Sequence, residues 1–197
     1  MSSRPATVDD IELIAATIAH AFLADPVWGV ALARADGATG HLNQYWRVFV
    51  ESAVSYATAF VADDGSAVSV WIPPGEPELS DVQKATIDDL ARTHLDAPAV
   101  RALHELWDRF DANHPQDEPH AYLSLLAAHS DHRGRGAGQQ LLSEDLARFD
   151  ARGLAAFLES TNPANDHRYA RAGFQRIGGF SSVIDGAPIS TMWRAGP

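Results

Sequence analysis

The order of sequence patterns predicts one α/β domain built around a mixed sheet. Three observations support it: a hairpin pattern at residues 59–72, a strand–loop–helix–strand run at 122–158, and two strand patterns at 174–193. A chain of 197 residues suits a single domain, residues 1–197, that buries about 70% of its unfolded surface. Helical patterns at about 76–118 are expected as an insert in that domain.

The N-terminal quarter predicts two helices. Thr7 and Asp10 have the spacing of a capping box, and the apolar residues that follow recur at helical spacing, so a helix is expected over residues 8–23. Asp25-Pro26 ends it, because the residue before a proline disfavours the helical conformation. A second helical pattern covers residues 41–56.

The middle of the chain changes from strand to helix periodicity. Residues 59–62 and 67–72 flank Asp64-Gly65, which predicts a hairpin. Pro73-Pro74 ends its second strand, because proline lacks the amide that a strand pairing needs. The helical pattern then runs from residue 80 to about 113, with a break near Asp96.

The C-terminal part alternates strands and helices. The strands are expected at 122–127, 155–158, 174–182 and 188–193, and the helices at 136–152 and 163–172. Gly153 and Gly173 follow the two helices, which is the position that glycine favours at a helix end. These elements complete the mixed sheet.

Composition narrows the class of protein. The net charge is −11, there is no cysteine, no apolar run reaches the roughly 18 residues of a membrane span, and the N-terminus has no apolar leader segment. We therefore expect a cytoplasmic protein without disulfides or thiolate metal sites, and no membrane or nucleic-acid partner. The acidity suits a cationic partner, and it equally serves solubility.

The segment from residue 128 to 139 carries the clearest chemical signal. Its glycines lie between a buried strand and a helix, where free amides and the helix dipole bind anions. Arg133 and Arg135 can add charge-assisted contacts to a phosphate. The spacing fits neither the dinucleotide fingerprint nor a P-loop. The alternative is a flexible glycine loop without a ligand.

The same segment resembles the signature of the GNAT acetyltransferase superfamily, Q/R-x-x-G-x-G/A, at Arg133–Gly138. The run from Tyr169 to Gly173-Phe174 lies at the distance that the superfamily shows. The resemblance implies a mostly antiparallel sheet flanked by helices, with two strands splayed at a coenzyme A site and acetyl-CoA as co-substrate. The first strand would be short, because only residues 2–6 are free for it and Pro5 interrupts them.

Within the superfamily the chain resembles puromycin N-acetyltransferase and its actinobacterial relatives most. The residues concerned are Phe60–Gly65, Ala67–Trp71, Phe157–Glu159, Asn165, Tyr169 and Gly173-Phe174.

The resemblance also implies which residues bind coenzyme A. Backbone groups of Leu126, Ala127 and Ala128 would pair with the pantetheine amides. Either Asn162 or Asn165 would be the asparagine that often contacts the cofactor. The pyrophosphate would lie on backbone amides of Gly134, Arg135, Gly136, Ala137, Gly138 and Gln139.

The expected reaction is direct attack of an amine on the thioester. The resemblance places Tyr169 as the acid for the leaving thiolate, with a packed core tyrosine as the alternative. Glu159 is the candidate base, or else a structural carboxylate, and His129 is a weaker candidate. A lysine-like amine with a pKa of ~10.4 costs about 4.6 kcal/mol to deprotonate at pH 7, whereas an amine at ~7.7 costs about 1 kcal/mol.

Acceptor residues are harder to select. Asp25, Trp28 and Trp71, with Tyr45 and Trp46, could line an acceptor pocket, or several of them could be core. The histidines lack metal-binding spacings, so no metal is expected. We expect a small-molecule amine acceptor, an antibiotic or metabolite, and a monomer or homodimer. The alternatives are a hydroxyl acceptor, a protein or peptide N-acetyltransferase, and a non-catalytic acyl-CoA-binding regulatory module.

Overall fold

The computed structural model describes residues 2–132 and 134–197. One mixed sheet has the strand order β1-β2-β3-β4-β5-β7-β6. Neighbouring strands are antiparallel except for β4 and β5, which run parallel. The strands are β1 (Ser3–Pro5), β2 (Ala59–Ala62), β3 (Ala67–Ile72), β4 (His120–Ala128), β5 (Ala155–Ser160), β6 (Gln175–Ser181) and β7 (Pro188–Arg194). The predicted α/β class and mostly antiparallel sheet are confirmed.

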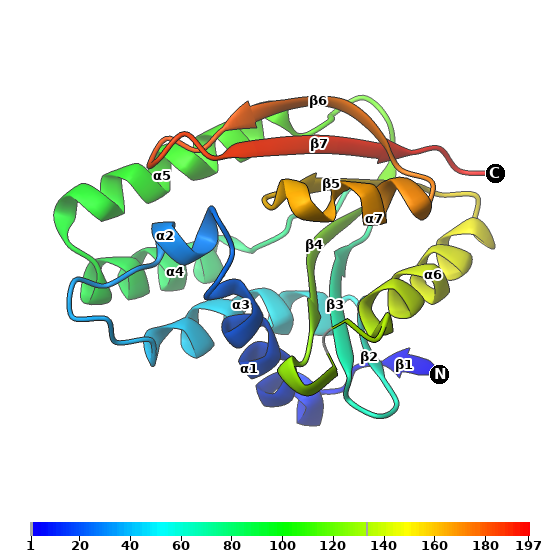
Figure 1. The fold of residues 1–197 in the computed structure, drawn as a ribbon, viewed down its shortest axis with the longest axis horizontal. Coiled ribbons are helices and arrows are strands. Elements are labelled where there is room, and N and C mark those ends of the chain that lie inside the picture. Colours follow the sequence, from blue (N-terminus) through cyan, green and yellow to red (C-terminus); the bar gives the residue numbers. More distant parts are fainter. Residues whose placement is uncertain (1, 133) are drawn as a thin grey trace.

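Helices cover both faces of this sheet (Figure 1). Short 3₁₀ turns at Val8–Asp10, Ser130–His132 and Pro163–Asn165 precede three of them. The helices are α1 (Ile11–Phe22), α2 (Trp28–Ala31), α3 (His41–Ser55), α4 (Asp81–His94), α5 (Ala97–Asn113), α6 (Ala137–Asp150) and α7 (Asp166–Arg171).

Two buried apolar clusters divide the core between the two faces. The first joins α1, α3, α4 and α5 to one face of the sheet, with Val68 and Val70 contributed by β3. The second joins α6 to the other face, with Trp71 and Leu158 contributed by β3 and β5. Alternation along each strand assigns its residues to one cluster or the other.

The N-terminus folds as its sequence predicts. The side chains of Thr7 and Asp10 form the capping box, and both oxygens of the Asp10 carboxylate accept hydrogen bonds from Arg4 at 2.7 Å. The Arg4 hydrogen bonds hold the pKa of Asp10 well below its usual range. Helix α2, absent from the sequence prediction, begins where the Asp25 carboxylate accepts hydrogen bonds from the amides of Val27 and Trp28.

Strands β4 and β5 separate partway along their length. They pair only from His120–Leu123 to Ala155–Leu158. The pairing of β4 with β3 skips Ser124, because Trp71 pairs with Leu123 and Val70 with Leu125. Such a bulge bends the strand that carries it. The bend therefore lies where β4 leaves β5 and opens the sheet.

Candidate active site

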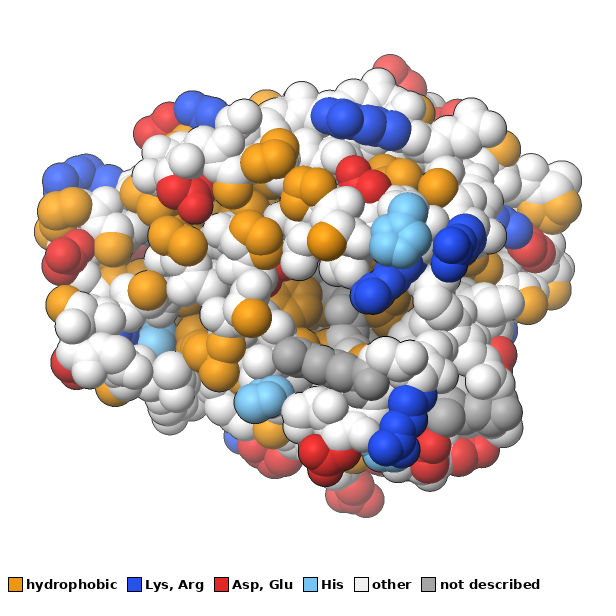
Figure 2. Space-filling view, viewed as in Figure 1, with side chains coloured by type: hydrophobic (Ala, Val, Ile, Leu, Met, Phe, Trp, Pro, Cys, Tyr) orange, Lys and Arg blue, Asp and Glu red, His pale blue; other side chains and the backbone are white. Residues whose placement is uncertain are grey.

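A cavity of about 490 Å³ lies where β4 and β5 part. Figure 2 shows a hollow near the centre of this face, with hydrophobic side chains gathered on its left and basic and histidine side chains on its right. The lining residues come from α1, α2, α3, α5, β4, β5, α7, the segment before α4, and the loop that leads into α6.

The glycine-rich loop forms one end of the cavity. Gly134 and Gly136 have φ values of +78° and +83°, which glycine adopts without strain. Gly134, Gly136, Ala137, Gly138 and Gln139 line the cavity. Arg135 is exposed and is absent from the lining, and Arg133 lies outside the described residues. This end therefore presents the first turn of a 14-residue helix to the cavity.

Strand β4 supplies a free backbone edge. Leu126, Ala127 and Ala128 pair with β3 on one side and line the cavity. On the other side β4 has no pairing with β5 beyond Leu123 among the described residues. Peptide groups on this edge are available to an extended ligand that carries amides.

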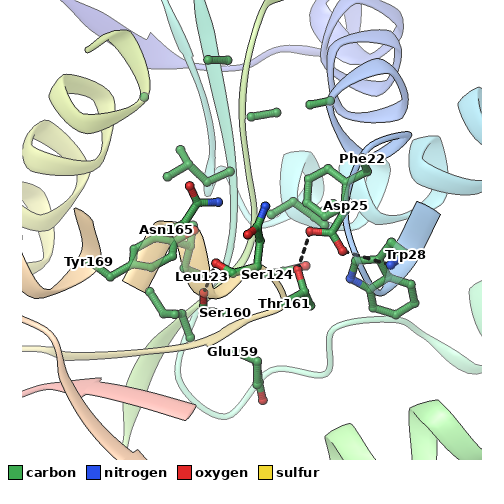
Figure 3. A pocket seen from close by; sticks show the side chains of 18 of the residues that line it. Phe22, Asp25, Trp28, Leu123, Ser124, Glu159, Ser160, Thr161, Asn165 and Tyr169 are labelled. Carbon is green, nitrogen blue, oxygen red and sulfur yellow. Dashed lines mark hydrogen bonds between the residues drawn. The ribbon is translucent and has the colours of Figure 1, made fainter. Parts of the chain in front are cut away.

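Tyr169 projects into the cavity from α7 (Figure 3). Its ring packs on Phe174, with centroids 6.2 Å apart, beside the second cluster. Burial, followed by the charges of Asp25 and Asp166, raises the pKa of its hydroxyl to about 12. The hydroxyl is therefore protonated at neutral pH, a state that can donate a proton but not accept one.

Glu159 lies on the opposite face of β5. Its neighbour Leu158 belongs to the second cluster, so alternation turns Glu159 towards α5. In Figure 3 its side chain runs downward, away from Tyr169. The side chain is 2% exposed, and its Oε1 lies 3.6 Å from Nδ1 of His114. Its Oε2 is buried without a hydrogen-bond partner.

Burial raises the pKa of Glu159, against the opposing effects of His114 and the Tyr122 hydroxyl. A buried carboxylate with a free oxygen on a cavity wall is suited to accept a proton. His129, the weaker candidate base, has its Nδ1 3.8 Å from Asp131 and is absent from the cavity lining. The geometry favours Glu159 over His129 as the proton acceptor.

Asn162 and Asn165 both line the cavity. The Asn162 side chain accepts a hydrogen bond from the amide of Ala164 at 3.1 Å, and that of Asn165 accepts one from Arg168 at 3.0 Å. Each amide group therefore keeps its nitrogen for a ligand. The two asparagines remain alternatives for the cofactor contact.

Asp25 has a structural role at the cavity wall. Besides the amides at the start of α2, its carboxylate accepts a hydrogen bond from the Thr161 hydroxyl at 2.7 Å (Figure 3). This contact joins the α1–α2 turn to the end of β5. The predicted cation contact of Asp25 therefore competes with hydrogen bonds that both of its oxygens already make.

The tryptophans divide between cavity and core. Trp28, Trp46 and Tyr45 all belong to the first cluster, but only Trp28 and Trp46 also line the cavity. Trp71 is also absent from the lining, which corrects the prediction that it contacts the acceptor. It is fully buried in the second cluster, where its indole donates to Asp145 at 2.9 Å.

Sequence reasoning missed Glu78, which lies in the segment before α4 and lines the cavity. Burial raises its pKa to about 7, with a hydrogen bond from Ser124 opposing the shift and the nearby Glu159 adding to it. No periodic pattern surrounds Glu78, so only the folded chain places it at the site.

The described part of the chain contains neither a candidate metal site nor a candidate membrane-spanning helix. It contains no group of three or more histidine and acidic side chains placed to hold a metal ion. None of its helices combines the length and hydropathy needed to cross a membrane.

Residues 99–174 match the model of the acetyltransferase (GNAT) family. The structure is also similar to an acetyltransferase from Corynebacterium glutamicum, described as a histone acetyltransferase HPA2 and related acetyltransferase. The TM-score is 0.71 at 26% identity, over 100% of this chain and 96% of that one.

Two eukaryotic structures share the fold at lower identity. Arylalkylamine N-acetyltransferase 2 from Aedes aegypti has a TM-score of 0.68 at 14% identity, over 98% of both chains. The polyamine N-acetyltransferase of Drosophila melanogaster has a TM-score of 0.59 at 15% identity, over 98% of this chain and 99% of that one. The chain thus has the GNAT fold, and the match of residues 99–174 to the family model supports a relation to the GNAT acetyltransferases.

Proposed function

We propose that the protein is an N-acetyltransferase that moves the acetyl group of acetyl-CoA to a small amine by direct attack on the thioester. The observation that carries the proposal is the cavity at the parted strands. One end has the glycine loop, and Tyr169 and Glu159 line its two sides. The superfamily uses acetyl-CoA as its co-substrate, and the residues present suit that group.

The fit to coenzyme A rests on two features of this chain. The first turn of α6 and the positive-φ glycines before it offer amides to a pyrophosphate. The edge of β4 from Ser124 to Ala128 has no pairing with β5, which suits the amides of a pantetheine arm. Acetyl-CoA supplies the activated acetyl thioester when bound.

Tyr169 and Glu159 divide the two proton transfers. The amine nitrogen forms the new bond to the acetyl carbon as the carbon–sulfur bond breaks. Glu159, which lines the cavity, accepts the proton that the amine loses. The Tyr169 hydroxyl donates a hydrogen bond to the departing sulfur and supplies its proton as negative charge builds up there.

The helical walls of the acceptor side favour a small molecule over a peptide. The segment before α4 and helix α5 both line the cavity, and both belong to the insert at 76–118. An antibiotic or a metabolite amine would suit such a site, in keeping with the resemblance to puromycin-type enzymes. We propose a cytoplasmic protein that acts as a monomer or homodimer, within the single domain 1–197.

The test is release of free thiol from acetyl-CoA in the presence of a panel of amines that includes puromycin. We expect release that requires both an amine and the protein, together with a mass increase of one acetyl group on the amine. Acetyl-CoA binding without release from any amine of the panel would contradict the proposal and favour a regulatory acyl-CoA-binding module.

A further inference from the structure

The acceptor side of the cavity has more acidic residues than the proposed reaction needs. Three acidic residues line the cavity among those that the structure describes: Asp25, Glu78 and Glu159. Hydrogen bonds from two backbone amides and from Thr161 already engage the Asp25 carboxylate. Glu78 and Glu159 are therefore the carboxylates with capacity for a ligand.

One carboxylate oxygen of Glu159 has no hydrogen-bond partner within the described part of the protein. Its side chain is 98% buried, since 2% is exposed, yet its Oε2 has no hydrogen-bond partner. A buried carboxylate oxygen without a partner loses its hydration and gains no hydrogen bond in return, which is unfavourable.

Glu78 is held in place by the backbone of its own segment. Its carbonyl accepts a hydrogen bond from the Ser52 hydroxyl at 2.6 Å. The preceding carbonyl, of Pro77, accepts one from Tyr56 at 3.2 Å. These contacts tie the segment to the end of α3 and place Glu78 on the cavity wall, near Ser124 at the bulge of β4.

Aromatic rings surround the same side of the cavity. Trp28 lies at the centre of them, with ring centroids 5.1 Å from Trp107 and 5.4 Å from Phe110. Trp46 packs edge-on against Trp28 at 5.5 Å. All four rings line the cavity. Ring faces beside carboxylates attract ammonium or guanidinium groups, because the electrostatics of both favour a cation.

The charge balance of the reaction leaves Glu78 without a partner. When the amine attacks, its nitrogen is neutral, so it brings no positive charge to this side of the cavity. The carboxyl group of Glu78 then remains at the cavity wall, where burial raises its pKa and a nearby cation would favour its charged form. The basic lining residues described, His132 and Arg168, belong to the loop and to α7 rather than to this side. His114, which also acts on the charge of Glu78, lies 3.6 Å from the Glu159 carboxylate.

We propose that Glu78 and the rings around Trp28 form a subsite for a second positively charged group on the acceptor, so that the preferred substrates are small diamines or amino-guanidines. This inference rests on the proposed function, because it assigns the reacting amine to Glu159. The net charge of −11 favours the approach of such dications.

The experiment compares two acceptors that differ by one ammonium group, 1,4-diaminobutane and butylamine. We expect kcat/KM for thiol release to be at least tenfold higher with the diamine. In Glu78→Gln, the diamine should lose this advantage mainly through a higher KM, while butylamine changes less than threefold. Glu76→Gln, at an exposed position two residues earlier, should leave both acceptors unchanged.

A binding measurement separates this inference from the proposed function. Calorimetric titration of the diamine into the protein with coenzyme A present needs no turnover, and we expect Glu78→Gln to weaken it at least tenfold. The Glu78→Asp variant keeps the charge, so we expect it to retain the preference for the diamine that Glu78→Gln loses.

Equal kcat/KM for the two amines, or a diamine advantage that survives in Glu78→Gln, would overturn the subsite and leave the proposed function intact. Diamine binding that depends on Glu78 without any thiol release would support the subsite and overturn the proposed acetyl transfer.

Discussion

The two ends of the cavity are built from different parts of the chain. The loop end comes from one continuous segment, β4 to α6, and offers mainly backbone groups. The acceptor end is assembled from α1, α2, α3, α5, β4, β5 and the segment before α4, and it offers side chains. A backbone site binds what all substrates of a superfamily share, whereas a side-chain site can change its specificity one residue at a time.

The parted strands β4 and β5 separate these two ends. Tyr169 lies on the side of the second cluster, and Glu159 faces α5 on the side of the first. A thioester placed between the strands would have the acid on one side and the base on the other. Substitutions can therefore affect the leaving group, the amine, cofactor binding or the core separately.

The largest effect is expected for Tyr169→Phe. The variant lacks the proton donor for the departing sulfur, so kcat should fall by about 10²–10⁴. The affinity for acetyl-CoA should stay within about twofold, because Tyr169 is proposed to act on the leaving group alone. Steady-state thiol release and calorimetric titration measure the two quantities. Parallel losses of kcat and affinity would instead assign Tyr169 to cofactor binding.

Glu159→Gln should reduce the rate by about 10–10² with amines whose pKa is near 10.4. With an amine whose pKa is near 7.7 the loss should be smaller, because less of that amine is protonated at pH 7. Burial raises the pKa of Glu159 above its ordinary value. Since the base must be ionised, the wild-type rate should rise with pH through that raised pKa.

The pH profile provides the control for this variant. The limb that belongs to Glu159 should be absent from the kcat/KM profile of Glu159→Gln. An identical limb in both proteins would show that another group accepts the proton.

Gly136→Ala should weaken acetyl-CoA binding by about 5–30-fold, since a non-glycine residue at positive φ costs about 1–2 kcal/mol. Gly136 has a φ of +83°, and an added Cβ would meet nothing within 4 Å, so the expected effect comes from the backbone. Gly65→Ala is the matched control, with a φ of +70° and equally open space in the β2–β3 turn. It should lower the melting temperature and leave acetyl-CoA affinity unchanged.

The smallest effect on activity is expected at Trp71. Trp71→Phe removes the indole that donates to Asp145, so it should cost about 1–3 kcal/mol of unfolding free energy. Its KM for amines should equal that of the wild type. Trp28→Phe, the same substitution at the cavity wall, should raise that KM several-fold. Denaturant unfolding and steady-state kinetics distinguish the two, and a raised KM in Trp71→Phe would contradict its assignment to the core.

Most of the fold could be predicted from local patterns. Helices α3 to α6 and the hairpin of β2 and β3 lie within about two residues of their predicted bounds, because their apolar residues repeat at helix or strand spacing. Helix α2 was missed, since its four residues are too few to show a period. A carboxylate cap and packing on α5 hold it instead.

The site was predictable where it is continuous in sequence. The glycine loop and Tyr169 belong to short motifs whose spacing is fixed. The face of the sheet on which Trp71 lies could not be predicted. All six residues of β3 are buried, so the strand does not alternate between polar and apolar residues. Glu78 was missed because its position depends on Ser52 and Ser124, which are distant in sequence.

Calorimetric titration of the wild-type protein with acetyl-CoA tests the central claim most directly. The account predicts saturable binding of one acetyl-CoA per chain, about 5–30-fold weaker in Gly136→Ala and unchanged in Gly65→Ala. Absence of binding, or equal weakening in the two glycine variants, would contradict the assignment of the glycine loop to the cofactor.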